Sequence, residues 1–396
     1  MNIAIFASAF HPHLGGVEEL VRQLAHELRR RGHGVIILTN RWPRNLPTYE
    51  DFEGLPVYRL PFRTSEDSVK SKLSYHFTHR RILRETLRIL DRHAIDVMHV
   101  QCVSSNALYA LRAREQRPRP LVVTLQGELT MDATGLFERS MGARETLRRA
   151  LLEADVVTGC SAKTVRDAEE FLGAPVKDST VVFNAALIED FRVAQPWVHS
   201  RPYIFAIGRL VPQKGFDLLI QSFAEANVAS HDLIVAGEGP ERADLEELVR
   251  RLGLSGRVHL PGRADRPMVA RYFKGCQFLV LPSRADEGLP VVCAEGMAAG
   301  KAIIATRSGG APEAVLHGET GLIVERCDGA ALAAAIRKLC QAPELRRAFG
   351  EAGAARASEF SWPVITEQYL RVYERSLAAS ARGAGDPSEV LVGRGA

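Results

Sequence analysis

The chain has 396 residues, of which 46% are hydrophobic and 25% charged, and its formal net charge is +4. This length exceeds what one hydrophobic core usually organises, so it predicts two domains of about 200 residues each. The small net charge and the lack of long lysine or arginine runs argue against a nucleic-acid partner.

Cysteine usage and hydropathy narrow the class of protein further. The six cysteines are scattered without a C-x-x-C pair, which argues against a zinc site and against a disulfide framework. The opening residues MNIAIFASAF lack a basic leader, so we interpret them as a strand and not as a signal peptide. No stretch approaches the roughly 18 apolar residues that a membrane span requires. We therefore expect a cytoplasmic protein.

The first half of the chain alternates short apolar runs with amphipathic segments. An amphipathic helix is expected at 17–31, ending at Gly32. The expected strands are at 2–9, 35–39, 96–100, 120–124, 156–159 and 180–183. Short buried strands that alternate with helices are typical of a parallel sheet covered on both faces.

The same pattern restarts after an irregular stretch at about 185–202. The expected elements are a strand at 203–207, a helix at 216–226, a strand at 232–236, a helix at 241–252, and strands at 258–260 and 277–281. The sequence thus predicts an α/β fold of two doubly wound Rossmann-like domains facing across a cleft. In such sheets ligands bind beyond the carboxyl ends of the strands, so the cleft is the expected site.

The domain boundaries follow from this pattern. We expect an N-terminal, acceptor-binding domain at 1–190 and a C-terminal, donor-binding domain at 203–360. A helix at 361–379 is expected to pack back toward the N-terminal domain, and the tail at 380–396, rich in Gly, Ala and Ser, is expected to be disordered.

The segment after the strand at 277–281 carries the strongest chemical signal. Glu287 and Glu295 flank Gly288-Leu289-Pro290, and Pro290 suits the first turn of a helix. The amides ahead of that helix would favour an anion, while the two carboxylates can accept hydrogen bonds from hydroxyl groups. This spacing suits a sugar, a diphosphate and a ribose in line.

Two cations follow the strand at 203–207. Arg209 and Lys214 can neutralise a pyrophosphate without a metal ion. The alternative is that both pair with surface acids and that Glu295 only caps its helix or faces water. Neither a metal ion nor another cofactor is expected.

Five motifs together resemble a known enzyme family. They are "PHLGGVEELVRQLAHELRRRGH" at 12–33, "GRLVPQKG" at 208–215, "AGEGPERADLEEL" at 236–248, "EGLPVVCAE" at 287–295 and "ATRSGGAPEAV" at 305–315. With them the chain resembles the family 4 retaining glycosyltransferases of the GT-B fold. The resemblance covers nearly the whole chain and is weakest at 41–95, where such enzymes build their acceptor site.

The resemblance implies roles for individual residues. Arg209 and Lys214 would hold the donor pyrophosphate, Glu295 the ribose and Glu287 the transferred sugar. The remaining donor contacts that it implies, several of them through the main chain, are Gly15, Gly16, Arg263, Gly288, Leu289 and Pro290. His99 is an acceptor-side catalytic candidate, with a hydrogen-bonded core histidine as the alternative. Gln126 stands where many relatives carry a histidine, which casts doubt on proton transfer at that position.

The segment 69–92 is unusually basic. Arg81, Arg84, Arg88 and Arg92 share one helical face, while Leu83, Leu87 and Leu90 lie on another. Either this is a solvated helix packed on the sheet, or its basic face contacts an anionic membrane or a phosphorylated lipid acceptor. The second interpretation would place the protein peripherally at the inner face of the membrane.

Function follows from the site and the resemblance. We expect a retaining glycosyltransferase that moves a sugar from a nucleotide-diphosphate sugar to a hydroxyl acceptor, in bacterial glycan, glycolipid or natural-product biosynthesis. A UDP-sugar is the preferred donor, and GDP-mannose remains open. The alternatives are a nucleotide-sugar epimerase of the same fold and a non-catalytic partner subunit that binds a nucleotide sugar.

Overall fold

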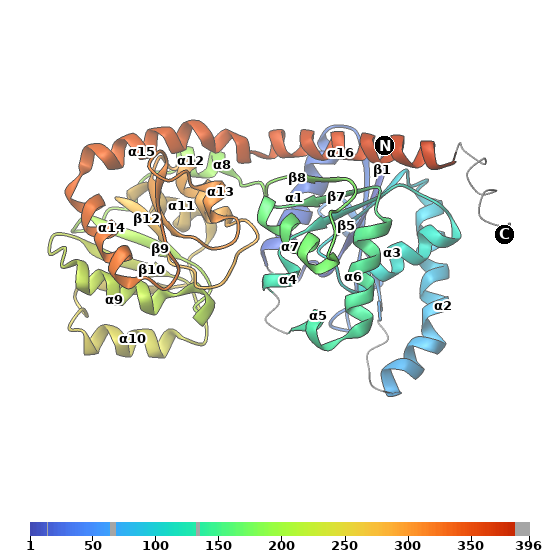
Figure 1. The fold of residues 1–396 in the computed structure, drawn as a ribbon, viewed down its shortest axis with the longest axis horizontal. Helices are drawn as coiled ribbons and strands as arrows, with labels where there is room; N and C mark the ends of the chain where they lie inside the picture. The colour runs from blue at the N-terminus through green and yellow to red at the C-terminus, as the bar shows by residue number, and fades with distance from the viewer. Residues whose placement is uncertain (14, 64–68, 132–134, 385–396) are drawn as a thin grey trace. The chain divides into compact units, whose positions relative to one another are not determined.

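The structure is a computed structural model that describes residues 1–13, 15–63, 69–131 and 135–384. The chain forms two compact units, coloured along the sequence in Figure 1. The first unit contains Met1–Val182 and Ile365–Ala396, and the second contains Phe183–Val364. Among the described residues, no helix combines the length and the apolar character needed to cross a membrane.

The first unit is built on an eight-stranded sheet with the order β3-β4-β2-β1-β5-β6-β7-β8. Neighbouring strands are parallel except for the β3–β4 hairpin, which is antiparallel. The strands are β1 (Asn2–Ala7), β2 (Gly34–Asn40), β3 (Tyr49–Phe52), β4 (Leu55–Leu60), β5 (Val97–Gln101), β6 (Leu121–Leu125), β7 (Val156–Gly159) and β8 (Ser179–Val181). Because β1 has neighbours on both sides, its residues from Ile3 to Ala7 are completely buried.

Helices cover this sheet. They are α1 (Gly16–Arg30), α2 (Val69–Arg92), α3 (Ser105–Gln116), α4 (Glu128–Met131), α5 (Leu136–Arg139), α6 (Met141–Glu153), α7 (Ala162–Leu172) and α16 (Trp362–Ala384). α1 shows why such segments become helical. It buries Val21, Leu24 and Leu28, which recur on one face, and it has acidic residues in its first turn and arginines in its last turn, which complement the helix dipole.

The second unit has a six-stranded sheet with the order β11-β10-β9-β12-β13-β14. Every neighbouring pair is parallel. The strands are β9 (Tyr203–Ile207), β10 (Asp232–Ala236), β11 (Val258–Gly262), β12 (Phe278–Leu281), β13 (Ala302–Thr306) and β14 (Gly321–Val324). The helices are α8 (Ile188–Val193), α9 (Phe216–Ala226), α10 (Arg242–Arg251), α11 (Arg266–Gly275), α12 (Val291–Ala298), α13 (Ala311–Ala314), α14 (Gly329–Gln341) and α15 (Pro343–Arg356), with 3-10 turns η1 (Pro212–Lys214) and η2 (Ala357–Phe360).

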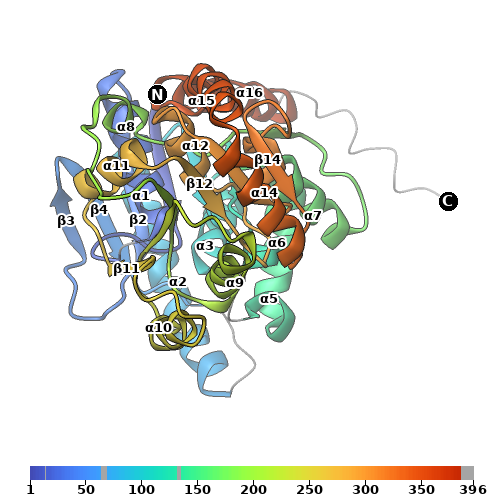
Figure 2. The same cartoon turned by 90° about the vertical axis from the view of Figure 1, so that its left-hand side faces the viewer.

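Alternation along these strands produces a layer of side chains on each face. Ile204 and Ala206 of β9 belong to a core that also contains Phe216 and Phe223 of α9. Phe205, which lies between them in the sequence, packs instead against the rings of Tyr272 and Phe273 of α11. Figures 1 and 2 show α9 and α10 on one side of this sheet and α11 and α12 on the other.

Both sheets reverse their strand order once. In the first unit the chain fills one side of β1 first and then continues with β5 on the other side. In the second unit the same reversal falls between β9 and β12. The loops that follow β1, β5, β9 and β12 therefore lie at the two switch points, where ligands of such sheets bind.

The predicted fold class of two doubly wound α/β halves is confirmed. The division between the units falls after Val182, whereas the sequence placed the end of the N-terminal domain at 190. The reason is packing, because Phe183 stacks on Phe360 and α8 contacts α11 and α12.

The C-terminal region also differs in one respect from its prediction. α16 continues as a helix to Ala384, so residues 380–384 are not disordered, and the rest of the predicted tail lies outside the described residues. Tyr369 and Tyr373 on this helix are buried within the first unit, against Gln101 and His99 of β5.

Candidate active site

Two loops meet at the switch point of the second unit. The loop after β9 carries Arg209 and ends in the turn Pro212–Lys214, and the loop after β12 begins at Pro282. Gly215 joins them, because it has a φ of +66° and a Cβ there would lie 2.3 Å from the carbonyl oxygen of Pro282. The amide of Arg284 also donates to the carbonyl of Gln213 at 2.8 Å. This close backbone approach brings the side chains of the two loops together.

Lys214 and Glu287 form an ion pair across the two loops. The lysine Nζ lies 2.8 Å from Oε2 of the carboxylate, and the two side chains are 26% and 11% exposed. The Ser283 hydroxyl donates to Oε1 of the same carboxylate. An ammonium group has three donors, so this contact leaves Lys214 able to bind a phosphate oxygen as well. Lys214 therefore does pair with an acid, but this acid is a predicted site residue that is mostly buried and not one of the surface acids of the alternative interpretation.

The other two basic candidates lie at the same edge of the sheet. Arg209 follows the end of β9 and Arg263 follows the end of β11, and both are exposed. Within the residues that the structure describes, no side-chain ion pair is found for either of them. Both guanidinium groups are therefore accessible to an anionic ligand.

The loop at 282–290 is shaped by a neighbouring glycine. Gly309, in the loop after β13, has a φ of +51°, and a Cβ there would lie 1.8 Å from the carbonyl oxygen of Glu287. The Gly309 amide donates to Oδ1 of Asp286 at 2.7 Å, and the Gly310 amide donates to the Glu287 carbonyl at 2.9 Å. The Ser308-Gly309-Gly310 segment of the motif at 305–315 was given no role in the sequence analysis. The structure shows that its glycines support the loop that carries Asp286 and Glu287.

The predicted helix after this loop is α12. Pro290 is its N-cap and Val291 its first residue, so Pro290 lies one position ahead of the first turn that was predicted for it. Gly288 and Leu289 precede the cap, and both are buried. The main chain of this segment therefore lies at the amino-terminal end of the helix, where the dipole favours an anion.

Glu295 lies on α12, in its second turn. Its partly buried side chain makes no hydrogen bond to the residues that the structure describes. Burial raises the pKa of the Glu295 carboxyl to about 7, and Asp190 adds to this while Arg266 opposes it. The carboxyl can therefore accept a hydrogen bond from a hydroxyl group when it is ionised and can donate one when it is protonated.

The first unit holds the predicted Gly15 and Gly16 at its own switch point. Gly15 is the N-cap of α1 with φ −148°, and Gly16 begins the helix. Neither residue has a positive φ, so backbone conformation does not require glycine at these two positions. A Cβ on Gly16 would meet no described atom within 4 Å, whereas a Cβ on Gly15 would lie 2.4 Å from Oε2 of Glu18.

His99 is a core residue. Its side chain has no solvent exposure, Nδ1 lies 2.9 Å from the Tyr373 hydroxyl and Nε2 lies 2.7 Å from Oγ1 of Thr124. Burial lowers the pKa of the imidazole to about 3, so it is neutral at physiological pH. With both ring nitrogens occupied, this geometry favours the core-histidine interpretation over a catalytic one.

The polar cluster near Gln126 is also buried. Gln126 donates to Oε1 of Gln101 at 3.2 Å, and the carboxylate of Glu128 accepts from the amides of Val103 at 2.7 Å and Gln126 at 2.8 Å. Burial raises the pKa of Glu128 despite these amides. The cluster fixes the loops after β5 and β6 at the carboxyl edge of the first sheet.

Comparison with known proteins decides the class. Residues 188–356 match the model of the glycosyl transferases group 1, and residues 15–185 match that of the glycosyl transferase 4-like domain. The chain belongs to the GT-B glycosyltransferases.

Individual relatives span almost all of this glycosyltransferase. An uncharacterised glycosyltransferase of Methanocaldococcus jannaschii is 26% identical over 380 residues, which cover 93% of this chain and 97% of the relative. A GDP-mannose-dependent phosphatidylinositol monomannoside mannosyltransferase of Mycolicibacterium smegmatis is 26% identical over 360 residues, 87% of this chain and 90% of its own. The Anabaena protein HepE, solved in complex with UDP, shares the fold with a TM-score of 0.75 at 21% identity, covering 94% of this chain and all of that one.

Proposed function

We propose that this glycosyltransferase transfers a sugar from a UDP-sugar to a hydroxyl acceptor with retention of the anomeric configuration and without a metal ion. The observation that carries the proposal is the ion pair between Lys214 and Glu287, held at the switch point by two loops in close backbone contact. A diphosphate next to Lys214 and a sugar next to Glu287 would place the scissile bond between these two side chains.

The chemistry follows from the charges. Transfer breaks the bond between the anomeric carbon and a phosphate oxygen, and negative charge develops on the leaving diphosphate. Lys214, Arg209 and the main chain ahead of α12 would lie where this charge develops, so their stabilisation grows toward the transition state. Two cations and a helix terminus can supply the neutralisation that a metal ion supplies elsewhere.

Retention needs no protein base near the acceptor. In this proposal a phosphate oxygen of the donor takes the proton of the attacking hydroxyl. The buried state of His99 agrees with that role for the donor, because the described geometry leaves neither ring nitrogen available for proton transfer. Gln126, which cannot titrate, agrees with it as well.

Among the similar proteins, one supports a UDP-sugar as the donor and another supports GDP-mannose. HepE has been solved with UDP and also with UDP-glucose, whereas the mannosyltransferase relative uses GDP-mannose according to its name. The main chain and the two cations would hold the diphosphate of either donor in the same way. The nucleotide base must therefore be recognised by residues other than those that bind the diphosphate, and Arg263 is our candidate.

The test compares donors directly. The purified chain is screened by thermal shift with UDP-, GDP- and ADP-sugars, and reactions with the stabilising donor are analysed by mass spectrometry and by NMR of the anomeric proton. We expect stabilisation by a UDP-sugar, an α-linked product from an α-linked donor, and full activity after chelation. Sugar isomerisation without acceptor would instead identify an epimerase, and binding without turnover a non-catalytic subunit.

A second part of the proposal concerns the acceptor side. A hollow of about 1030 Å³ lies on the first unit between β3, β4 and the second half of α2. Its lining contains one carboxylate, Glu85, and the arginines Arg41, Arg59, Arg63, Arg81, Arg84, Arg88 and Arg92. Leu83, Leu87 and Leu90 of α2 are buried on the sheet, so the helix is packed through its leucine face and presents its arginine face to this hollow.

Aromatic side chains lie on the same part of the unit. Trp42 is 60% exposed, Tyr49 is 51% exposed and Phe77 is 73% exposed. Exposed aromatics beside arginines are typical of proteins that lie at a membrane interface. We propose that this arginine surface contacts the phosphates of an anionic lipid bilayer, an assignment that the phosphatidylinositol substrate in the name of the mycobacterial relative supports.

Vesicle binding tests this contact. Co-sedimentation with phosphatidylglycerol-containing vesicles should be strong at low salt and weak at high salt, and vesicles of phosphatidylcholine alone should not bind. Replacing Arg81, Arg84 and Arg88 by Gln should weaken binding by roughly 100-fold, at about 1 kcal/mol per arginine. The matched control replaces the exposed Arg250, Arg251 and Arg347 of the second unit by Gln, which removes the same charge. An equal loss of vesicle binding in both triple variants would mean that binding depends on net charge alone, which would contradict a specific lipid-binding surface.

A further inference from the structure

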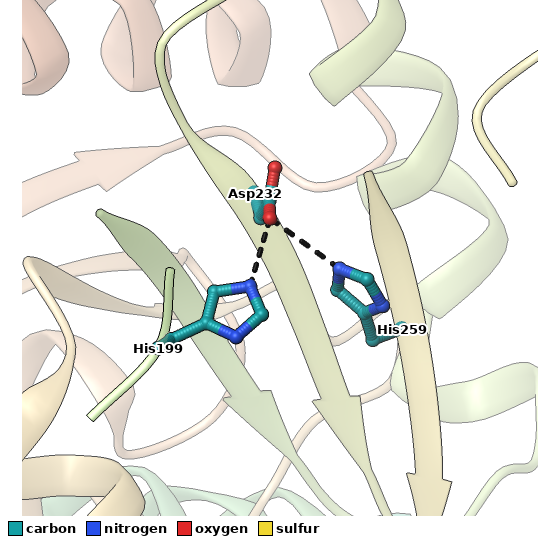
Figure 3. A group of neighbouring side chains, drawn as sticks. All are labelled: His199, Asp232 and His259. Atoms are coloured by element: carbon teal, nitrogen blue, oxygen red, sulfur yellow. Dashed lines mark hydrogen bonds and ion pairs between the residues drawn. The ribbon is translucent and has the colours of Figure 1, made fainter. Parts of the chain in front are cut away.

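Three side chains converge on one point at the amino-terminal end of the second sheet. Asp232 begins β10, His259 is the second residue of β11, and His199 lies in the segment that precedes β9. In Figure 3 the two imidazole rings lie on either side of the carboxylate and point toward it. This is the opposite edge of the sheet from Lys214, since the strands begin here and end there.

The distances suit a shared ion. Nε2 of His199 lies 2.8 Å and Nε2 of His259 lies 3.4 Å from the same carboxylate oxygen, Oδ2 of Asp232. The three atoms lie within 4.8 Å of one another. Ligand atoms at about 2 Å from a tetrahedral zinc ion are separated by roughly 3.3 Å, so the cluster needs only small side-chain shifts to enclose one.

The surroundings hold the ligands in place. The carboxylate of Asp232 is 2% exposed, and its other oxygen, Oδ1, lies 3.2 Å from Nε of Arg201 and 4.0 Å from Nε of Arg257. A metal-binding carboxylate usually has such outer partners, which fix its orientation. The His199 ring stacks on Trp197, with centroids 5.0 Å apart and planes inclined by 20°. One ligand is thus fixed by ion pairs and another by an aromatic ring.

We propose that His199, Asp232 and His259 bind one Zn²⁺ ion, with water as its fourth ligand. Two imidazole nitrogens and one carboxylate oxygen are a donor set that zinc accepts. His259 is 37% exposed, so its side of the site is open to solvent for ion entry. The ion ties the segment before β9 to β10 and β11, and it takes no part in sugar transfer.

The site is independent of the cysteines. The prediction that no zinc is bound rested on the absence of a C-x-x-C pair, and the three ligands here are histidine and aspartate residues far apart in the sequence. The site is also independent of the donor chemistry, because a strand of five residues separates the two edges by roughly 16 Å. Chelation should therefore change the stability of the chain and leave its transferase activity unchanged.

Direct metal binding tests the proposal. The full chain is stripped with a chelator, dialysed and titrated with ZnCl₂ in competition with a chromophoric indicator. We expect one zinc per chain and a rise in Tm on zinc addition. Replacing zinc by Co²⁺ should give the intense visible absorption of a four-coordinate ion.

Variants assign the site. His259→Ala, at the most exposed ligand, should weaken zinc binding by more than about tenfold and abolish the Co²⁺ absorption. His199→Ala should do the same, and the Tm of each zinc-free variant shows whether it has folded. His26→Ala is the matched control, because His26 also faces a carboxylate, that of Glu53 at 3.1 Å, but in the described part of the chain no second histidine joins this pair. That variant should bind zinc like the parent chain.

Two results would overturn the site. One is the absence of saturable zinc binding by the folded parent chain, which would leave the cluster as a network of hydrogen bonds and ion pairs. The other is unchanged zinc binding in folded His259→Ala and His199→Ala. Neither result would affect the donor site, whose own tests use residues of the other edge.

Discussion

The two units contain polar clusters that differ in how fully they are satisfied. In the first unit, His99 donates or accepts through both ring nitrogens, and Thr124 continues the chain of hydrogen bonds to Thr158 at 2.6 Å. In the second unit, Lys214 and Glu287 make one contact with each other and remain partly exposed. The first cluster is closed to a substrate, and the second has donors and solvent access left over.

This difference shows what distinguishes a binding residue from a structural one. His99 and Lys214 were both titratable candidates in the sequence, His99 within the buried strand β5 and Lys214 in the loop after β9. What separates them is spare hydrogen-bonding capacity at a surface that a ligand can reach. A buried and fully paired imidazole stabilises the fold, whereas a partly paired ammonium group can exchange a carboxylate partner for a phosphate.

The largest effect is expected from Lys214→Ala. Removing one electrostatic donor from a developing negative charge typically costs about 3–4 kcal/mol, so kcat should fall by roughly 100- to 1000-fold. Glu287 keeps its hydrogen bond from Ser283, so the fold should persist. Steady-state kinetics with the best donor, together with circular dichroism of the variant, measure both effects.

A matched control for this variant is Lys163→Ala. Lys163 also forms an ion pair with a carboxylate, that of Asp167 one turn along α7, but it belongs to the first unit and is not a predicted site residue. Its replacement should leave kcat unchanged. Full activity in Lys214→Ala would remove the assigned leaving-group role, and an equal loss in both variants would attribute the effect to stability.

Glu295 tests the donor site by its pH dependence. If the ionised carboxylate binds the ribose hydroxyls, kcat/KM for the donor should rise with pH and level off above the raised pKa of about 7. Glu295→Gln should flatten this profile and lower kcat/KM above pH 7 by roughly 10- to 150-fold, the value of a hydrogen bond to a charged group of about 1.5–3 kcal/mol. A profile that keeps its inflection near pH 7 in the variant would assign that pKa to another group.

The fold was largely predictable, while the site was predictable only in part. Short apolar strands revealed both sheets, because buried parallel strands leave a continuous hydrophobic signal. Arg209, Lys214 and Glu287 were predicted from the motifs at 208–215 and 287–295, and the structure brings Lys214 and Glu287 into contact. The contributions of Ser283 and Gly309 were missed, since they act through tertiary contacts between loops. The sequence also did not decide whether His99 is buried. Its partner Tyr373 lies on α16, more than half the chain away in sequence.

His99→Leu tests the closed cluster. The change leaves the Tyr373 hydroxyl without its partner, whereas Thr124 keeps its hydrogen bond with Thr158. The free energy of unfolding should therefore fall by about 1–3 kcal/mol while kcat stays unchanged. Denaturant unfolding and steady-state kinetics separate the two quantities. A large loss of kcat in a folded variant would restore the catalytic interpretation of His99.

The stability difference between the parent chain and His99→Leu should depend on pH. In the folded parent chain burial lowers the pKa of His99 to about 3, whereas the unfolded chain takes up this proton near pH 6.5. The stability that neutral His99 contributes is therefore complete above about pH 6.5, and it is lost by about 1.4 kcal/mol per pH unit as the pH falls from there toward 3. The difference in unfolding free energy between parent and His99→Leu should decrease as the pH falls through this window, change sign before about pH 3, and stay constant above about pH 6.5.

Tyr373→Phe should give the smallest effect. It removes only the hydroxyl that contacts Nδ1 of His99, while the ring keeps its place between α16 and the sheet. A net hydrogen bond contributes about 1 kcal/mol, so Tm should fall by a few degrees and kcat should not change. A much larger fall in Tm, or a fall in kcat, would contradict a purely structural role for the contact between Tyr373 and His99. A loss of the expected size would show that the first cluster contributes stability alone, in contrast to the ion pair of the second unit.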